Sequence, residues 1–420
     1  MKYLGKYLKS LCDFTLSTRI PSWKPDVIIV IPVYDEDDSF KQVLNHLLNQ
    51  TGELRSTQVL VLFNYRDSSP EALKSNTKSL YQDIKKSYES IQPGSIRFEF
   101  FIQELSGKKA GVGLARKMLM DLAFRIFHNN QKNGIIVNLD ADTIVQENYL
   151  DVISAYFDMN PLMEAGSIAF AHPVEGLHSD PDQMAAAQYE LHLRFFINMQ
   201  RLIHLPYAYQ TIGSAMAVRA WSYAKEGGMN KRQAGEDFYF LHKFSKNNTL
   251  GEINTTCVFP STRKSTRVPF GTGKAIIDLT AGNTIHATSY NPQSFLQLQS
   301  WIQTVFENYH RGSDNLLPGN LIVSDFVKYR NEENKLEEIR THTTGFPSFR
   351  KRFFQWFDAF MLMKYLHFLR DKSFHDLTIT ACVQYLFDKL ELKFKDEIYY
   401  LLDQLRQHDL KTKYNGISTY

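Results

Sequence analysis

Two aspartates one residue apart, Asp140 and Asp142, follow a short apolar run at residues 134–139. Such a run after a glycine is typical of a buried strand, and open α/β sheets bind ligands at the carboxyl ends of their strands. Two carboxylates at such an end are costly unless protons or a cation neutralise them. Because Mg²⁺ and Mn²⁺ prefer oxygen ligands and often share them with phosphates, the pair predicts a metal site that holds a diphosphate. A solvated turn is the commoner alternative for an isolated Asp-x-Asp.

Two basic segments could contact the phosphates of such a ligand. The first is a glycine-rich turn with Lys109, Gly111 and Arg116 at the start of an expected helix. Free N–H groups and the helix dipole favour anions there, although Arg116 stands where a dinucleotide-binding fingerprint needs its third glycine. The second is a loop with Arg263 and Arg267 among Ser, Thr and Gly residues, and arginine can bind phosphate through two hydrogen bonds. A plain flexible turn and a solvated basic loop are the respective alternatives.

A second acidic pair, Glu236 and Asp237, begins another expected helix shortly after Gly227 and Gly228. A carboxylate beside a hinge-like glycine turn could serve as a general base. Acidic residues are also common in first helical turns for capping alone, so that role stays open.

Histidine and cysteine spacing is uninformative about zinc. The histidines show no His-x-x-x-His pattern, and only His172 and His286 are candidates for a third metal ligand. The three cysteines are far apart, which excludes a disulfide framework and suits a reducing compartment.

The composition is that of an ordinary globular protein. The 420 residues are 43% hydrophobic and carry a net charge of +3, too small to indicate a nucleic-acid partner. The first residues lack the pattern of a signal peptide, and no apolar stretch of about 18 residues predicts a membrane span. We therefore expect a cytoplasmic protein.

The elements that must position these residues alternate between strand and helix in the first half of the chain. Apolar runs predict strands at 26–34, 58–63, 97–104 and 134–139, then at 166–171, 212–219 and 256–260. Helical periodicity follows the early strands, which indicates an α/β doubly wound parallel sheet. Helices are also expected at 182–205, 293–309, 321–340, 350–370, 376–392 and 396–409. The predicted segments are a lead-in at 1–24, an α/β domain at 25–290 and a helical region at 291–420.

The order of the motifs resembles glycosyltransferase family 2 on the GT-A fold, over roughly residues 25–288. The motifs are Pro32-Val33-Tyr34-Asp35-Glu36, the glycine–lysine turn with Arg116, Asp140-Ala141-Asp142, Gly213 to Arg219, Gly227-Gly228 and Gly235-Glu236-Asp237. The resemblance implies a GT-A-type, Rossmann-like, mostly parallel sheet flanked by helices, followed here by an all-helical region. It also implies metal-dependent, inverting transfer of a sugar from a nucleotide-sugar donor to a glycan or lipid-linked acceptor, in glycan or polysaccharide biosynthesis.

The resemblance and the candidates above together give roles to residues of this chain. Asp237 would be the catalytic base, with Gly228 and Glu236 on the acceptor side. The donor nucleotide would contact Pro32, Tyr34, Glu36, Asn64, Arg66, Lys109, Gly111, Arg116, Asp140, Arg263 and Arg267. Mn²⁺ or Mg²⁺ would be held by Asp140, Asp142 and His286. Asn64 and Arg66 stand where the family has an acidic residue after its second strand, and the Gln-x-x-Arg-Trp signature of processive synthases is absent.

Two alternative functions remain. Asp140 and Asp142 after an apolar strand also resemble haloacid-dehalogenase-like phosphatases, but that motif normally opens its domain, and Ile144 stands where Thr or Val is usual. The other alternative is an inactive GT-A-like carbohydrate-binding protein, which the retention of Asp140, Asp142 and Asp237 in the sequence disfavours.

The helical region contains a basic and aromatic stretch at residues 349–357. A helix there could lie peripherally on the inner face of an anionic membrane, with cations at the headgroups and aromatics below. The commoner alternative is that the aromatics pack into the core and the cations face water.

Overall fold

The computed structural model describes residues 2–11, 23–88, 94–107, 110–174, 180–230, 235–265, 267, 271–283, 287–319, 321–412 and 414. The chain divides into two compact units. Unit 1 holds Met1–Pro173 and Gln210–Lys274, and unit 2 holds Val174–Tyr209 and Ala275–Tyr420. This division differs from the boundary expected at residue 290, because residues 174–209 and 275–290 group with the C-terminal helices.

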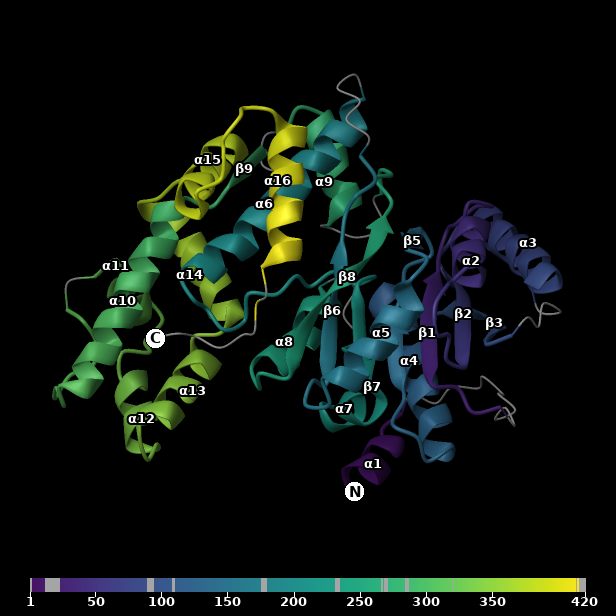
Figure 1. Ribbon diagram of the computed structural model, residues 1–420, viewed down its shortest axis with the longest axis horizontal. Helices are drawn as coiled ribbons and strands as arrows, with labels where there is room; N and C mark the ends of the chain where they lie inside the picture. The colour runs from purple at the N-terminus through teal and green to yellow at the C-terminus, as the bar shows by residue number, and fades with distance from the viewer. Residues whose placement is uncertain are drawn as a thin grey trace. The chain divides into compact units, whose positions relative to one another are not determined.

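Unit 1 is built around an eight-stranded sheet with the order β3-β2-β1-β4-β7-β6-β8-β5 in the described residues (Figure 1). The strands are β1 (Val27–Val33), β2 (Thr57–Arg66), β3 (Ile96–Leu105), β4 (Ile135–Asn138), β5 (Thr143–Val145), β6 (Ala165–Phe170), β7 (Met216–Arg219) and β8 (Leu250–Pro260). Strands β1 to β4 pair in parallel, as do β6 and β8. Strand β7 is antiparallel to β4 and β6, and β5 is antiparallel to β8. The expected mostly parallel sheet is confirmed.

Helices flank this sheet in unit 1. They are α1 (Lys2–Leu8), α2 (Phe40–Leu48), α3 (Glu71–Tyr88), α4 (Val112–Asn129), α5 (Tyr149–Met159), α7 (Ala220–Lys225), α8 (Glu236–Ser245) and the start of α9 (Thr272–Thr280). Strand β1 is buried along its whole length, as its continuous apolar run predicts. Because β1 and β4 are parallel neighbours, the loops that follow them leave the same edge of the sheet.

Unit 2 is helical, as expected for the C-terminal region. Its helices are α6 (Pro181–Leu202), α10 (Pro292–His310), α11 (Ile322–Tyr329), α12 (Lys335–Thr341), α13 (Phe346–Trp356), α14 (Ala359–Lys372), α15 (Ile379–Leu390), α16 (Ile398–Lys411) and the rest of α9. A two-residue antiparallel pair, β9 (Thr288–Ser289) and β10 (Leu377–Thr378), also lies in this unit.

Two long helices expected in the tail are each broken in two, so those predictions were wrong. Helices α11 and α12 are separated where Asn331 adopts a left-handed φ of 55°. Helices α13 and α14 are separated at Asp358, whose carboxylate accepts hydrogen bonds from the backbone N–H groups of Phe360 (2.9 Å) and Met361 (3.0 Å). That N-cap starts a new helix.

The aromatic residues of α13 lie in the core of unit 2. Phe349 and Phe353 are fully buried, and the ring centroid of Phe353 is 5.0 Å from that of Phe306 and 5.8 Å from that of Trp301. Arg352 on the same helix is exposed. The aromatics that a membrane-bound helix would insert into lipid are therefore already used in packing.

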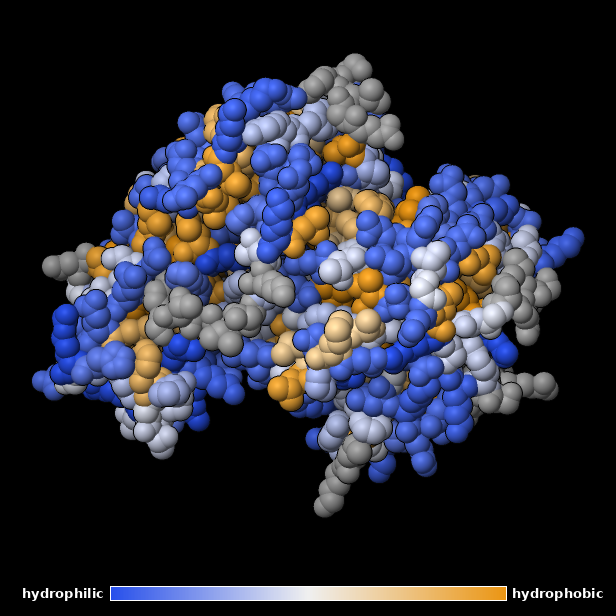
Figure 2. All heavy atoms as spheres, in the orientation of Figure 1, coloured by the Kyte–Doolittle hydropathy of each residue, from blue (hydrophilic) through white to orange (hydrophobic). Residues whose placement is uncertain are grey.

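The surface offers few large apolar side chains. The face shown in Figure 2 is mostly hydrophilic, and the described apolar side chains more than half exposed are Met159, Leu162, Tyr329 and Leu410. None of the helices in the described residues combines the length and apolar composition needed to cross a bilayer.

Candidate functional site

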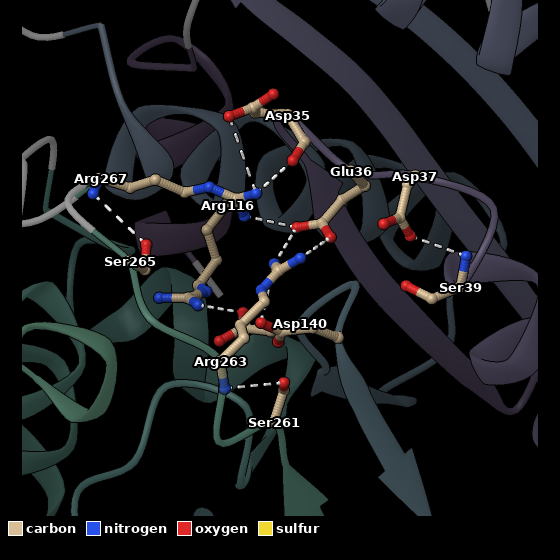
Figure 3. Close-up of polar contacts among 11 residues, drawn as sticks. Asp35, Glu36, Asp37, Ser39, Arg116, Asp140, Ser261, Arg263, Ser265 and Arg267 are labelled. Carbon is tan, nitrogen blue, oxygen red and sulfur yellow. Dashed lines mark hydrogen bonds and ion pairs between the residues drawn. The ribbon is translucent and has the colours of Figure 1, made fainter. Parts of the chain in front are cut away.

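The charged residues singled out in the sequence come together at one edge of the sheet of unit 1 (Figure 3). Glu36 follows β1, Asp140 and Asp142 follow β4, and Arg263 and Arg267 follow β8. Arg116 reaches the same place from α4, and Glu236 from the start of α8. Segments far apart in sequence thus form one acidic and basic cluster.

Arg116 links two of the acidic segments. Its guanidinium is buried, and Nη2 donates to Asp140 Oδ1 at 2.5 Å while Nη1 donates to Glu236 Oε1. Burial opposes the charge of Arg116, but Asp140 and Glu236 outweigh it, so its pKa is raised. Arg116 is therefore a permanent cation that holds two carboxylates in place.

Gly213 provides the space for this guanidinium. A Cβ atom at Gly213 would lie 2.9 Å from Nη2 and 3.0 Å from Nη1 of Arg116. Those distances are shorter than ordinary van der Waals contacts of a Cβ atom, so any side chain at position 213 would push the guanidinium of Arg116 away from Asp140 or Glu236.

Asp237 lies in the first turn of α8, next to Glu236. Its Oδ1 accepts a hydrogen bond of 2.7 Å from the backbone N–H of Phe238. Desolvation by the surrounding protein, together with the negative charge of Glu236, raises the pKa of Asp237 to about 7, although Arg116 acts in the opposite direction. A carboxylate that exchanges its proton near neutral pH has the property required of a general base.

Asp142 is the second carboxylate after β4. Desolvation is the main cause that raises its pKa to about 6; Asp140 and Glu36 add to the rise, and Arg263 opposes it. Arg263 Nη2 lies 2.8 Å from Asp142 Oδ2. Desolvation thus keeps the pKa of Asp142 raised even with an arginine beside it.

These carboxylates fit a divalent cation in their chemistry. Asp140 and Asp142 supply oxygen atoms, the ligands that Mg²⁺ and Mn²⁺ prefer, and a cation beside Asp142 would favour its ionised form. The described residues contain no group of three or more His, Cys, Asp or Glu side chains arranged around one ion position. The third expected ligand, His286, lies outside the described residues, and His172 hydrogen-bonds to Thr272 Oγ1 at 3.1 Å.

The expected nucleotide-binding residues at the ends of β1 and β2 are adjacent. Pro32 pairs with Leu62 in the sheet, and the buried Asn64 donates from Nδ2 to the carbonyl of Val33 at 2.8 Å. Asn64 therefore ties the ends of the two strands together. Arg66, which ends β2, has its backbone N–H donating to Ser69 Oγ at 3.1 Å.

Tyr34 and Gly111 both lie in unit 1. The guanidinium carbon of Arg267 lies 6.0 Å from the centre of the Tyr34 ring, which brings that ring to the basic loop. Gly111 is the N-cap residue of α4, the helix that carries Arg116. Lys109 lies outside the described residues.

Gly228, expected on the acceptor side, packs against the N-terminal helix. Its φ is +72°, and a Cβ atom there would lie 1.8 Å from the hydroxyl of Tyr7 on α1. Its carbonyl accepts a hydrogen bond of 2.9 Å from Lys243 Nζ. These contacts explain the glycine by close packing, without an acceptor.

The ion pairs within the site were not predicted from the sequence. Arg116 and Glu36, both predicted to contact the donor, also have charged protein partners. The available signal for Arg116 was its position, next to Lys117, between apolar residues of α4, since a charge buried in such a helix needs a partner. Nothing in the sequence pointed to Gly213 as the residue that faces it.

Neither a family model nor a curated protein sequence matches this chain. Among solved structures, S. aureus TarS residues 1–349 align with a TM-score of 0.37 and 12% identity over 68% of this chain and 73% of that chain. The same protein in complex with UDP-GlcNAc gives a TM-score of 0.39 and 14% identity over 75% and 79% of the two chains. Its complex with UDP gives 0.37 and 13% over 75% and 78%. Similarity at this level carries no argument about activity.

Proposed function

We propose that this chain is a glycosyltransferase that moves a sugar from a nucleotide-sugar donor to an acceptor hydroxyl. One observation carries the proposal: a candidate base, a candidate metal and diphosphate site, and basic side chains lie together at the same edge of the sheet. A carboxylate with a pKa near neutrality, Asp237, lies in the same charged cluster as the Asp140 and Asp142 pair and the arginines of the loop after β8. Sugar transfer from a nucleotide donor needs a base, a diphosphate site and charge neutralisation together.

Asp237 is the proposed base for the acceptor hydroxyl. Its neighbour Glu236 is held by Arg116, which keeps the first turn of α8 beside Asp140. With the base and acceptor on one side of the anomeric carbon and the diphosphate leaving group on the opposite side, the acceptor would displace the diphosphate directly. Such a displacement would invert the anomeric centre.

The diphosphate of the donor is proposed to lie between the Asp140 and Asp142 pair and the loop that carries Arg263 and Arg267. Both arginines are about a quarter exposed and suited to bidentate contacts with phosphate oxygens. Asp140 and Asp142 would hold Mg²⁺ or Mn²⁺. When bound, this ion would supply positive charge that stabilises the departing nucleoside diphosphate.

The phosphatase alternative requires Asp140 to act as a nucleophile. Arg116 occupies Asp140 Oδ1, and the strand that precedes Asp140 is the fourth of the sheet in chain order. No observation at the site favours this alternative over sugar transfer.

The proposal is tested by incubating the protein with a panel of sugar nucleotides and Mn²⁺, with water as the acceptor of the sugar, and measuring the nucleoside diphosphate released. We expect release from at least one donor, abolished by Asp237→Asn. Absence of release from every donor, combined with hydrolysis of p-nitrophenyl phosphate, would support the phosphatase. Thermal stabilisation by sugars without any release would support the inactive carbohydrate-binding protein, since a ligand at about 100 times its Kd adds about 2.7 kcal/mol of stability.

A further inference from the structure

Glu36 is a nearly buried carboxylate that receives both arginines of the loop after β8 (Figure 3). Its side chain is 3% exposed. Arg263 donates from Nη1 to Oε2 and from Nη2 to Oε1, both at 2.5 Å, and Arg267 donates from Nη1 to Oε1 at 2.6 Å. Arg267 also donates from Nη2 to the backbone carbonyl of Asp35. One residue of the β1–α2 connection thus binds two side chains from a distant loop.

The loop, defined here as Ser261 to Ser265 together with Arg267, leaves the sheet beside the acidic pair. Pro260, the last residue of β8, pairs with Thr143, the first residue of β5 and the neighbour of Asp142. Within the loop, backbone N–H groups donate to nearby serines, from Arg263 to Ser261 Oγ at 3.2 Å and from Arg267 to Ser265 Oγ at 3.3 Å. These bonds are local, so they shape the loop without attaching it to β1.

We propose that Glu36 is a positioning residue that attaches this loop to the end of β1 and holds both guanidinium groups beside Asp142, ready for the diphosphate of the donor. The inference rests on the proposed function, and it replaces the expectation that Glu36 contacts the nucleotide itself. Long arginine side chains lose conformational entropy when a ligand orders them, and a carboxylate that orders them beforehand removes much of that loss.

Direct electrostatic repulsion by Glu36 would weaken anion binding, whereas ordering of the arginines by Glu36 would strengthen it. A carboxylate close to a phosphate site repels the phosphate, so removing its charge should tighten binding. If Glu36 acts by ordering the arginines, removing its charge should weaken binding instead. The sign of the change therefore separates a positioning role from a nearby or competing charge.

The first measurement is calorimetric binding of inorganic pyrophosphate, and separately of UDP, in the presence of Mg²⁺. Glu36→Gln keeps the shape of the side chain and removes its charge; we expect roughly tenfold weaker binding, the scale of about 1.4 kcal/mol. The matched control is Asp38→Asn on the same connection, where the side chain is 78% exposed and should leave the affinity unchanged. Tighter or unchanged binding in Glu36→Gln would overturn the proposal.

A double-mutant cycle then shows whether Glu36 acts through the arginines. In an Arg263→Gln, Arg267→Gln background, the additional change Glu36→Gln should have no further effect on pyrophosphate affinity. A further loss as large as in the wild-type background would mean that Glu36 touches the ligand, which contradicts a positioning role.

Hydrogen exchange tests the attachment of the loop without any ligand. Amides of residues 263–265 should exchange about tenfold faster in Glu36→Gln than in the wild type or Asp38→Asn. Unchanged exchange overturns the proposal. If the wild type binds neither pyrophosphate nor UDP, the proposed function fails, whereas exchange still decides whether Glu36 holds the loop. Should Glu36→Gln not fold, Glu36→Asp keeps the charge on a shorter side chain, and exchange in that variant should also be faster.

Discussion

Arg116 on α4 and Glu236 at the start of α8 form a buried ion pair, with side-chain exposures of 3% and 4%. The same guanidinium binds Asp140 after β4. One arginine therefore connects the helix that carries the proposed base to the strand end that carries the proposed metal ligands.

Replacing Arg116 with Met should destabilise the protein by about 3–5 kcal/mol, because it leaves the buried carboxylate of Glu236 without its partner. Urea denaturation measures this loss. The variant Arg116→Met with Glu236→Gln removes both charges and should recover part of it. A loss below about 1 kcal/mol in the single variant would show that the pair adds little.

Gly213→Ala should displace the guanidinium of Arg116, since the new Cβ atom would lie 2.9 Å from Nη2. We expect a loss of about 1–3 kcal/mol in stability, as for overpacked cores, and reduced nucleoside diphosphate release. Gly319→Ala is the matched control, because a Cβ atom there meets nothing within 4 Å. Equal behaviour of the two variants would argue against a close contact at Gly213.

The raised pKa of Asp237 predicts how activity and stability depend on pH. As a base Asp237 must be ionised, so kcat/KM should rise with pH through an apparent pKa of about 7. Stability should change in the other direction. The ordinary pKa of an aspartate is 3.8. Between that pH and about pH 7, the folded protein keeps a proton on Asp237 that the unfolded chain releases, so the free energy of unfolding falls as pH rises. Asp237→Asn should flatten this dependence; an unchanged slope between about pH 5 and pH 8 would contradict the shift.

Asp142→Asn and Asp140→Asn should behave differently despite their proximity. Asp142 is desolvated, and its partner Arg263 would keep Glu36, so Asp142→Asn should leave stability near neutral while abolishing metal-dependent stabilisation by the donor. Asp140→Asn should in addition destabilise the fold, because Arg116 loses a charged partner. Thermal shifts with donor and Mn²⁺ measure both effects. Full metal-dependent stabilisation in both variants would place the metal elsewhere.

Much of the sheet follows from local sequence patterns. Strand β1 is a continuous apolar run and β4 is an apolar run that ends with Asn138, and the position of Asp140 and Asp142 at a strand end follows from the second run. The breaks at Asn331 and Asp358 were missed because helical periodicity continues across both turns, and a local backbone conformation or cap decides where each helix ends.

The pairings within the site were beyond the reach of local patterns. Glu36 and Arg263 are 227 residues apart, and Arg116 and Glu236 are 120 apart. These charges need partners because they are buried, and only the folded sheet buries them and brings them together. Gly228 illustrates the same limit, since the hydroxyl of Tyr7 that makes it necessary belongs to the first helix of the chain.

The most direct test of the proposed function compares turnover and donor affinity in the wild type and Asp237→Asn, with the donor found in the sugar-nucleotide panel. A base that acts only on the acceptor should, when removed, lower kcat by about 10²–10⁴-fold and leave the Kd of the donor nearly unchanged. Asp38→Asn should match the wild type in both quantities. Full activity in Asp237→Asn, or a loss of donor affinity as large as the loss of rate, would contradict the assignment of Asp237 as the catalytic base.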